Sequence, residues 1–311
     1  MKTNIPRVLS ELLRLRRPHG GLGEKLAQNI VMREVMGHGH AIVKDTHGNI
    51  QVQVGESNGI VFTAHLDTVH REDGEQVLFI ISETGEIVAD GADGKASVLG
   101  ADDASGVFLL LEMIQAKQPG MYLFFVGEEC GGIGSSAYVK DHSTFSANMV
   151  VSFDRRGTKD IITHQGGYRT ASDEFATALG LAMGTLDSTF EYAPSAGGLY
   201  TDSREFAELV PECTNISVGY YNEHTVRESQ DLDHLLRLRD VVVALNWTAL
   251  PVVRVPEPDL PWAGWDMDVP AFSTRKEALE AIAALREAAL AGDLSDVELN
   301  HYLDIIEGYV K

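Results

Sequence analysis

Apolar runs alternate with amphipathic segments along most of the chain, and this alternation predicts its elements. Continuous apolar runs, typical of strands buried on both faces, occupy 59–69, 121–129, 148–157 and 214–221. Helical length or spacing is found over much of the first forty residues and at 105–116, 171–184, 203–210 and 230–250. Buried strands that alternate with helices predict an α/β sheet that is largely parallel in its middle.

Two further segments predict β-hairpins, because in each of them two short apolar runs flank residues that favour turns. They lie at 41–55, around THGN, and at 76–90, around ETGE. Near residue 250 the pattern changes. Residues 251–270 are rich in proline and tryptophan and predict a linker, and residues 271–311 predict a pair of helices. We therefore expect a main domain at 1–250 and a C-terminal helical extension that packs on it or mediates self-association.

Composition narrows the classes of partner. The 311 residues carry a formal net charge of −21, which would repel nucleic acids and anionic membranes. The sequence contains no apolar stretch long enough to span a bilayer. Its two cysteines, Cys130 and Cys213, cannot form a disulfide framework. These features favour a cytoplasmic protein with no nucleic-acid or membrane partner.

Candidate chemistry collects where the apolar runs end. Residues able to bind a metal lie at or just after the ends of these runs, and one pair lies just before a predicted helix. In chain order they are His65 and Asp67, Asp102 and Asp103 (the pair before the helix), Glu128 and Glu129, Asp154, and His224. In an open α/β sheet ligands bind beyond the carboxyl ends of the strands, so these side chains should converge on one crevice. Crowded carboxylates repel one another unless a cation neutralises them. The pattern therefore predicts a metal site.

The donor set favours zinc, with cobalt or manganese as alternatives, because it combines two imidazoles with carboxylates. Two divalent ions would be neutralised by Asp102, Glu129, Asp154 and a bridging hydroxide, whereas one ion would leave the same acids with excess negative charge. Paired ions can hold a bridging water, lower its pKa and polarise a carbonyl. The sequence therefore predicts two divalent metal ions.

The adjacent glutamates of GEECGG suggest two different roles. Neighbours on an extended segment point to opposite sides, so one carboxylate can bind metal while the other stays free to move protons. We assign Glu128 as the general base and acid and Glu129 as a metal ligand, although spacing alone leaves the reverse open. Asp67 is expected to accept a hydrogen bond from His65 and fix its tautomer.

These motifs resemble those of the dinuclear zinc exopeptidases, a group that includes leucyl aminopeptidases, tripeptidases and carboxypeptidase G-type enzymes. The resemblance covers roughly residues 40–250 and rests on AHLDTV, GADDASG, GEECGGIGS, SFDRRG and NEHTVRE. It implies a three-layer α/β/α fold with a mixed, centrally parallel sheet. It also implies a cis peptide between Asp102 and Asp103.

The resemblance further implies a role for each site residue. It places His65 and Asp154 on one metal, Glu129 and His224 on the other, and Asp102 between them. It places Asp67 behind His65 and makes Glu128 the base. Carboxypeptidase-like and deacylase-like members insert a lid domain between the aspartate and the last histidine. The chain from Asp154 to His224 is too short for one, which favours a lidless, leucyl-aminopeptidase-like type.

Three residues are candidates for substrate binding. Arg155, in DRRG, either grips a substrate carboxylate or balances the charge of nearby acids. The resemblance places Tyr200 and Asp202, in GGLYTDSRE, near the pocket.

The main functional hypothesis is an aminopeptidase that hydrolyses short peptides through a metal-bridging water with Glu128 as base. The alternatives are a carboxypeptidase or N-acyl amino acid deacylase that uses the same metals, and a non-catalytic peptide-binding protein. The expected partner is a small peptide or acyl amino acid. Another copy of the chain is a second candidate if the C-terminal helices mediate self-association rather than pack on the main domain.

Overall fold

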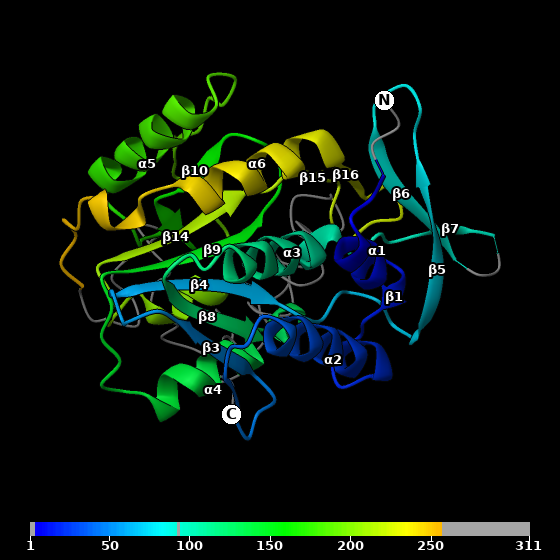
Figure 1. The fold of residues 1–311 in the computed structure, drawn as a ribbon, viewed down its shortest axis with the longest axis horizontal. Helices are drawn as coiled ribbons and strands as arrows, with labels where there is room; N and C mark the ends of the chain where they lie inside the picture. The colour runs from blue at the N-terminus through cyan, green and yellow to red at the C-terminus, as the bar shows by residue number, and fades with distance from the viewer. Residues whose placement is uncertain (1–3, 92–93, 257–311) are drawn as a thin grey trace, which may run out of the picture. The chain divides into compact units, whose positions relative to one another are not determined.

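A mixed eight-stranded sheet forms the centre of the fold in the computed structural model, which describes residues 4–91 and 94–256 (Figure 1). Its strand order is β13-β10-β14-β9-β4-β8-β3-β2. The four middle strands are parallel: β14 (Glu212–Ser217), β9 (Met149–Arg155), β4 (Ile60–His65) and β8 (Gly120–Phe125). The prediction of a mixed, centrally parallel sheet is confirmed.

The strands outside this parallel group are short or antiparallel. β3 (Ile50–Val54) runs antiparallel to β8, and β2 (Ile42–Lys44) pairs with it as the predicted hairpin. At the other edge β10 (Asp160–Ile162) is antiparallel to β14 and parallel to β13 (Ala193–Ser195). A separate small hairpin joins β11 (His164–Gln165) and β12 (Tyr168–Arg169).

Helices cover both faces of the sheet, which gives the expected three layers. On one face α3 (Ala101–Gln115) lies across β4 and β9. The same face carries α1 (Arg7–Leu13), α2 (Leu22–Gly37), α5 (Asp173–Leu186) and α6 (Leu232–Ala244). The other face carries α4 (Ile133–Asp141) and η2 (Asp202–Phe206). The helix predicted at 203–210 is therefore a short 3-10 segment. Two more 3-10 turns are η1 (Glu128–Cys130) and η3 (Trp247–Ala249).

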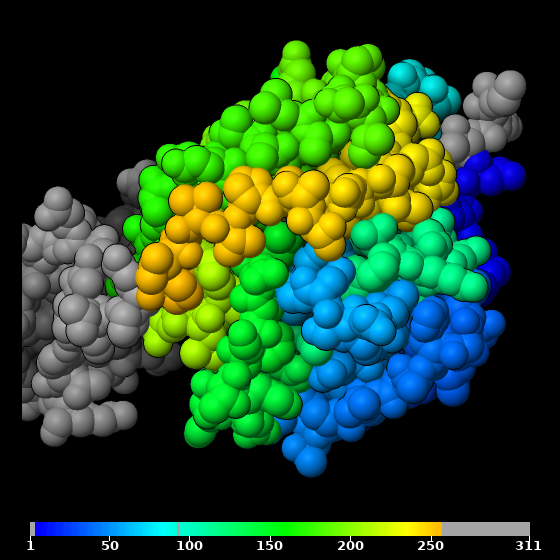
Figure 2. All heavy atoms as spheres, turned by 60° about the vertical axis from the view of Figure 1, so that its left-hand side comes forward, coloured from blue at the N-terminus to red at the C-terminus, as the bar shows by residue number. Residues whose placement is uncertain are grey.

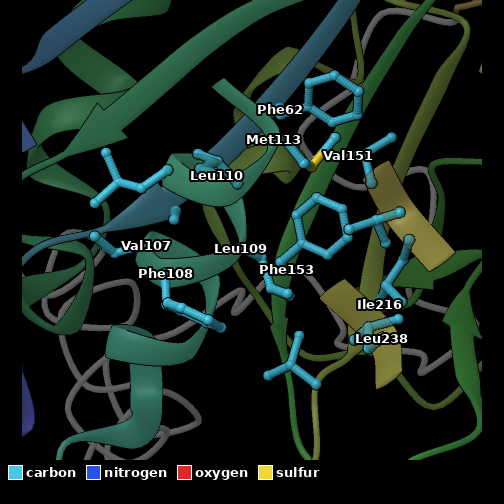
Figure 3. Close-up of a cluster of buried hydrophobic side chains, with 14 of the residues drawn as sticks. Phe62, Val107, Phe108, Leu109, Leu110, Met113, Val151, Phe153, Ile216 and Leu238 are labelled. Atoms are coloured by element: carbon cyan, nitrogen blue, oxygen red, sulfur yellow. The ribbon is translucent and has the colours of Figure 1, made fainter. Parts of the chain in front are cut away.

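Neighbouring strand residues pack into different layers because successive side chains of a strand point to opposite faces. Phe62 lies in the larger apolar cluster beneath α3, whereas Val61 lies in the smaller cluster beneath α4 and η2. Figure 3 shows Phe62 and Phe153 of the sheet facing side chains of α3, including Met113. The continuous apolar runs of the sequence thus reflect strands buried on both sides.

A second sheet lies beside the first, at the right of Figure 1. Its strand order is β1 (Leu15–Arg16), β5 (Gly74–Ile80), β6 (Glu86–Gly91), β16 (Ser229–Asp231) and β15 (Tyr220–Tyr221), and β7 (Ala96–Ser97) also pairs with β6. The antiparallel pairing of β5 with β6 confirms the hairpin predicted at 76–90. Strands β15 and β16 hold both ends of residues 222–228, the segment that carries His224.

The end of the described chain packs on the main domain. Figure 2 shows α6 and the following residues, in yellow and orange, beside α5 in green. The backbone N–H groups of Val253 and Arg254 donate to one carboxylate oxygen of Glu212, at 2.7 and 3.0 Å. The predicted linker beyond residue 256 and the predicted helix pair at 271–311 lie outside the described residues. No helix within the described ranges is long and apolar enough to cross a membrane.

Candidate metal centre

The predicted ligands gather at the carboxyl ends of the parallel strands. His65 is the last residue of β4, and Asp154 stands one residue before the end of β9. Glu129 lies in η1, just after β8, and Asp102 in the first turn of α3. His224 follows β15. Because these strands run side by side, five residues that are distant in sequence share one crevice.

Asp102 occupies the middle of this group. Its Oδ1 is 3.0 Å from Nε2 of His65, and its Oδ2 is 3.1 Å from Nε2 of His224. One carboxylate therefore faces both imidazoles with different oxygens. The peptide bond from Asp102 to Asp103 is cis, as the resemblance implied.

Each imidazole also approaches a second carboxylate. Nε2 of His224 is 3.1 Å from Oε2 of Glu129, and Nε2 of His65 is 3.5 Å from Oδ1 of Asp154. Asp154 is held in place by two hydroxyl groups. Thr201 Oγ1 donates to its Oδ2 at 2.6 Å, and the Tyr220 hydroxyl donates to its Oδ1 at 3.0 Å. The ligand candidates thus form two half-sites on either side of Asp102.

Asp67 organises the turn that carries the two glutamates. Its carboxylate oxygens accept the backbone N–H groups of Glu128 and Glu129, at 3.0 and 3.1 Å. Its Oδ1 lies 3.5 Å from Nδ1 of His65, longer than an ordinary hydrogen bond. The expected contact of Asp67 with His65 is therefore its weakest. Its two hydrogen bonds with the backbone of Glu128 and Glu129 fix the course of the chain after β8.

The glycines after the glutamates allow a close approach to Tyr200. Gly132 has φ of 65°, and a Cβ atom there would lie 2.0 Å from the Tyr200 hydroxyl oxygen. A side chain at this position would therefore collide with the tyrosine and strain the backbone. The sequence GEECGG combines two acids with a backbone that only glycine can supply.

Burial and mutual repulsion raise the pKa of most acids in the centre. Burial raises the pKa of Glu128 well above its usual range, and burial together with Asp102 raises that of Glu129 to about 7. Burial and Asp102 also raise the pKa of Asp154. Burial alone would lower the pKa of His224, but its hydrogen bonds with Asp102 and Glu129 raise it to about 12. Protons thus compensate for crowding that a cation would relieve.

The donor atoms fit a metal ion. His65, Asp102 and Glu129 each offer one ligand atom, and these atoms lie within 4.8 Å of one another. His65, Asp103 and Asp154 form a second such group. Glu129 Oε1 is buried and has no hydrogen-bond partner among the described residues. A buried carboxylate oxygen that has no hydrogen-bond partner is costly in a protein interior unless a cation binds it.

A cavity of about 90 Å³ opens beside this centre. Its walls include the candidate base and ligands Glu128, Asp102, Asp154 and His224, the predicted substrate contacts Arg155 and Tyr200, and also Arg156 and Glu223. Asp202 is not among the lining residues and is 1% exposed. Direct contact between substrate and Asp202 would therefore require the surrounding structure to open.

The two arginines of DRRG differ in how far they are engaged. Arg155 donates from Nε and Nη2 to Oδ2 of Asp160, both at 3.1 Å, and its side chain is 14% exposed. Within residues 4–91 and 94–256, Arg156 makes one ion pair, from Nη1 to Oε1 of Glu223 at 2.9 Å, and its side chain is 56% exposed. Arg156 is thus the more available guanidinium, although the sequence favoured Arg155.

Two buried charged residues that the sequence analysis did not single out contact the ligand segments. Glu228 accepts two backbone N–H groups around Asp102, and Arg17 donates to backbone carbonyls beside the same turn. Each is 1% exposed. In the sequence, Arg17 and Glu228 are recognisable only as charged residues within an apolar or motif-bearing segment. That signal does not show that their side chains are buried.

Comparison with known proteins gives a family and several similar structures. A family model described as Peptidase family M28 matches residues 46–234. A tripeptidase from Staphylococcus aureus shares 14% identity and a TM-score of 0.62, covering 76% of this chain and 95% of the other. Aminopeptidase PepT from Bacillus cereus shares 16% identity and a TM-score of 0.58, covering 78% of this chain and 98% of the other.

A third similar structure is the TET1 peptidase of Pyrococcus horikoshii, described as assembling into a tetrahedron or a large octahedral shell. It shares 14% identity and a TM-score of 0.57, covering 76% of this chain and 97% of the other. At these identities the structures establish a common fold. The search of curated proteins found no match.

Proposed function

The chain belongs to peptidase family M28, and from this membership we propose that it is an aminopeptidase that trims short peptides with the help of two divalent ions. Membership makes the chain a metallopeptidase, as the resemblance to dinuclear zinc exopeptidases predicted. The number of ions, the end of the peptide that is trimmed and the roles of individual residues are part of the proposal.

The position of Asp102 is the observation that carries it. Its two oxygens face different imidazoles at 3.0 and 3.1 Å, and each imidazole has its own further carboxylate. We assign His65 and Asp154 to one ion, His224 and Glu129 to the other, and Asp102 to both. Imidazole nitrogens mixed with carboxylate oxygens favour zinc over magnesium or calcium.

Glu128 is the proposed proton carrier. When bound, the two ions would polarise the scissile carbonyl and acidify the attacking water. Glu128 lines the cavity, and its Oε2 is 3.9 Å from His65 Nε2, so it stands beside the ligands without joining their close contacts. Its carboxylate accepts one proton from the water as the C–O bond forms. It gives that proton to the peptide nitrogen as the C–N bond breaks.

The charge of the cavity supports trimming from the N-terminus. Of the acids in its walls, Asp102 and Asp154 are assigned to the ions and Glu223 pairs with Arg156, which leaves Glu128 as a carboxylate with no assigned counter-charge. A free α-ammonium group is attracted by such a wall, whereas a free α-carboxylate is repelled at the same depth. The scissile bond of an N-terminal residue would then lie next to Glu128.

One observation favours the second candidate, a carboxypeptidase or N-acyl amino acid deacylase. Arg156 lines the cavity with Nη2 and Nε outside its pair with Glu223, and these atoms can bind a terminal carboxylate. Parallel assays separate the two candidates. Faster hydrolysis of amino acid anilides supports the aminopeptidase, and faster hydrolysis of N-acetyl amino acids supports the deacylase.

Glu128→Gln tests the chemical step. The amide keeps the shape of the side chain but cannot accept the proton, so turnover should fall by about 10²–10⁴-fold. Metal content, measured by elemental analysis, should equal that of the wild type.

Glu129→Gln is the matched control, because it should lower metal affinity as well. Wild-type turnover in Glu128→Gln would exclude Glu128 as the base. A metal-loaded wild type that cleaves no peptide would instead indicate a binding protein.

A further inference from the structure

The buried carboxylate of Glu228 accepts hydrogen bonds from the backbone of Gly100 and of Asp102. Oε2 of Glu228 accepts the N–H of Gly100 at 2.8 Å, and Oε1 accepts the N–H of Asp102 at 3.0 Å. Glu228 is 1% exposed and is the last residue of the segment 222–228 that carries His224. Both of its oxygens are therefore occupied in joining that segment to the turn that carries Asp102.

A buried guanidinium holds the same turn from another direction. Arg17 Nη2 donates to the carbonyl oxygen of Gly100 at 2.9 Å, and Nε donates to that of Leu66 at 2.9 Å. Nη1 donates to the carbonyl oxygen of Leu12 at 2.8 Å. Arg17 thus connects the residue after His65 with the residue two positions before Asp102. It precedes the residues that the family model matches.

Gly100 is hydrogen-bonded to both Glu228 and Arg17. Its N–H binds Glu228, and its carbonyl binds Arg17, while its φ of 72° turns the chain into α3. Arg17 and Glu228 also attract one another electrostatically, which compensates part of the cost of burying each charge. Three ligand-bearing segments are therefore tied together by two side chains that do not reach the candidate metal site themselves.

We propose that Glu228 and Arg17 are positioning residues that set the place of the Asp102 carboxylate between His65 and His224. The proposal rests on the proposed role of Asp102 as the shared metal ligand. A carboxylate shared by two ions must be placed accurately relative to both imidazoles, because ligands held by a supporting shell bind metal more tightly. The two side chains supply that placement through the backbone.

Substitution of Glu228 by Gln should disturb this placement at nearly constant volume. Both partners of Glu228 are N–H donors, so the NH₂ group of a glutamine would face one of them. One backbone N–H would lose its acceptor inside the protein, and the turn would shift to relieve the contact. We expect Glu228→Gln to weaken zinc or cobalt binding by roughly 10–100-fold.

Glu212→Gln is the matched control. Glu212 is also fully buried and also accepts several N–H groups, those of Ser172, Val253 and Arg254. It lies at the start of β14, at the end of the strand opposite to the metal centre. The wild type and both variants would first be stripped of metal. Their affinity for added zinc or cobalt would then be measured by calorimetry, and their thermal stability by circular dichroism. Glu212→Gln should lower stability and leave metal affinity near that of the wild type.

Arg17→Lys provides an independent variant if Glu228→Gln does not fold. A lysine keeps the charge but cannot reach three carbonyl oxygens with the planar fork of arginine, so metal affinity should again fall. In both variants excess metal should restore most of the turnover, since Glu128 is unchanged.

The outcomes are distinct. Wild-type metal affinity in a folded Glu228→Gln or Arg17→Lys protein would overturn the proposal, and so would an equal loss in Glu212→Gln. A wild-type protein that binds no metal would instead contradict the proposed function.

Discussion

Glu128 and Glu129 are neighbours in the chain, yet their carboxylates have different surroundings. Glu129 contacts His224 at 3.1 Å, whereas the closest imidazole nitrogen to Glu128 is 3.9 Å away. The bonds from Asp67 to both backbone N–H groups fix this difference. A turn of two residues can therefore supply one group that binds and one that stays free for proton transfer.

A second pair of neighbours, Arg155 and Arg156, leads to a prediction about substrate. Arg155 is bound by Asp160, whereas Arg156 lines the cavity with part of its guanidinium available. We expect Arg156→Gln to raise KM about tenfold for short peptides with a free C-terminal carboxylate, through loss of a charge-assisted hydrogen bond. KM for the same peptides as C-terminal amides should change little. Steady-state kinetics on both series provide the measurement.

Arg169→Gln is the control for this experiment. Arg169 is similarly exposed and pairs with Asp173, but it is absent from the cavity walls. An equal rise in KM for acids and amides in Arg156→Gln would indicate a general disturbance of the cavity rather than recognition of a carboxylate.

The site residues differ in how readily the sequence reveals them. His65, Asp102, Glu129, Asp154 and His224 could be predicted to meet, because each follows a strand or begins a helix and all are metal-binding types. Arg17 and Glu228 could not be predicted. Their significance comes from being buried and from bonding to backbone groups far away in the chain, such as those of Gly100. No local pattern records that contact.

At the scale of whole elements, helix α6 is fixed to the sheet by a buried histidine. His234 Nε2 is 2.8 Å from the Tyr192 hydroxyl, which itself donates to the carbonyl oxygen of Ser217 at 2.6 Å. The hydroxyl proton is thus used, so Nε2 must carry the proton of the shared bond. A neutral and a charged imidazole can both donate from Nε2, but burial lowers the pKa of His234 to about 4 and so favours the neutral form.

This histidine should make stability depend on pH. The unfolded chain binds the proton near pH 6.5, whereas the folded chain resists it down to about pH 4. Stability is therefore lost as pH falls through this window, by about 2 kcal/mol between pH 7 and pH 5. His234→Gln should remove this part of the dependence in urea unfolding curves. Parallel curves for His234→Gln and the wild type would contradict the assignment.

The elements that the sequence predicted are those with long or continuous apolar runs. The four parallel strands have continuous apolar runs, and α3 has a long apolar segment. Helix α4 was not predicted, because its buried residues are Gly134, Ser135 and Tyr138, which leave no apolar stripe. Strand β13 has three residues, including Pro194, and it forms at the edge of the sheet. Such short edge strands are specified by their neighbours rather than by their own sequence.

At the scale of the whole molecule, the metal centre and the fold should stabilise one another. The crowded carboxylates come from separate strands and turns between Asp67 and Asp154, and bound cations would relieve their repulsion. An ion that binds the folded chain alone raises its stability by about 2.7 kcal/mol when its free concentration is 100 times Kd. For a domain of this size, we expect zinc to raise the melting temperature by roughly 5–10 °C.

The measurement compares thermal unfolding after treatment with a chelator and after addition of zinc. Glu129→Gln should show a smaller rise, because one carboxylate ligand is lost. Identical melting temperatures with and without zinc, at concentrations where binding is detected, would show that the centre does not couple to folding in this way.

The alternating packing of β4 has a consequence for how chains of this kind can diverge. Val61 and Phe62 belong to opposite layers, and His65 ends the same strand. A single inserted residue within β4 would exchange the two faces and turn the imidazole away from Asp102. We therefore expect length variation to be tolerated in turns such as 81–85, and insertions or deletions inside the four parallel strands to abolish activity.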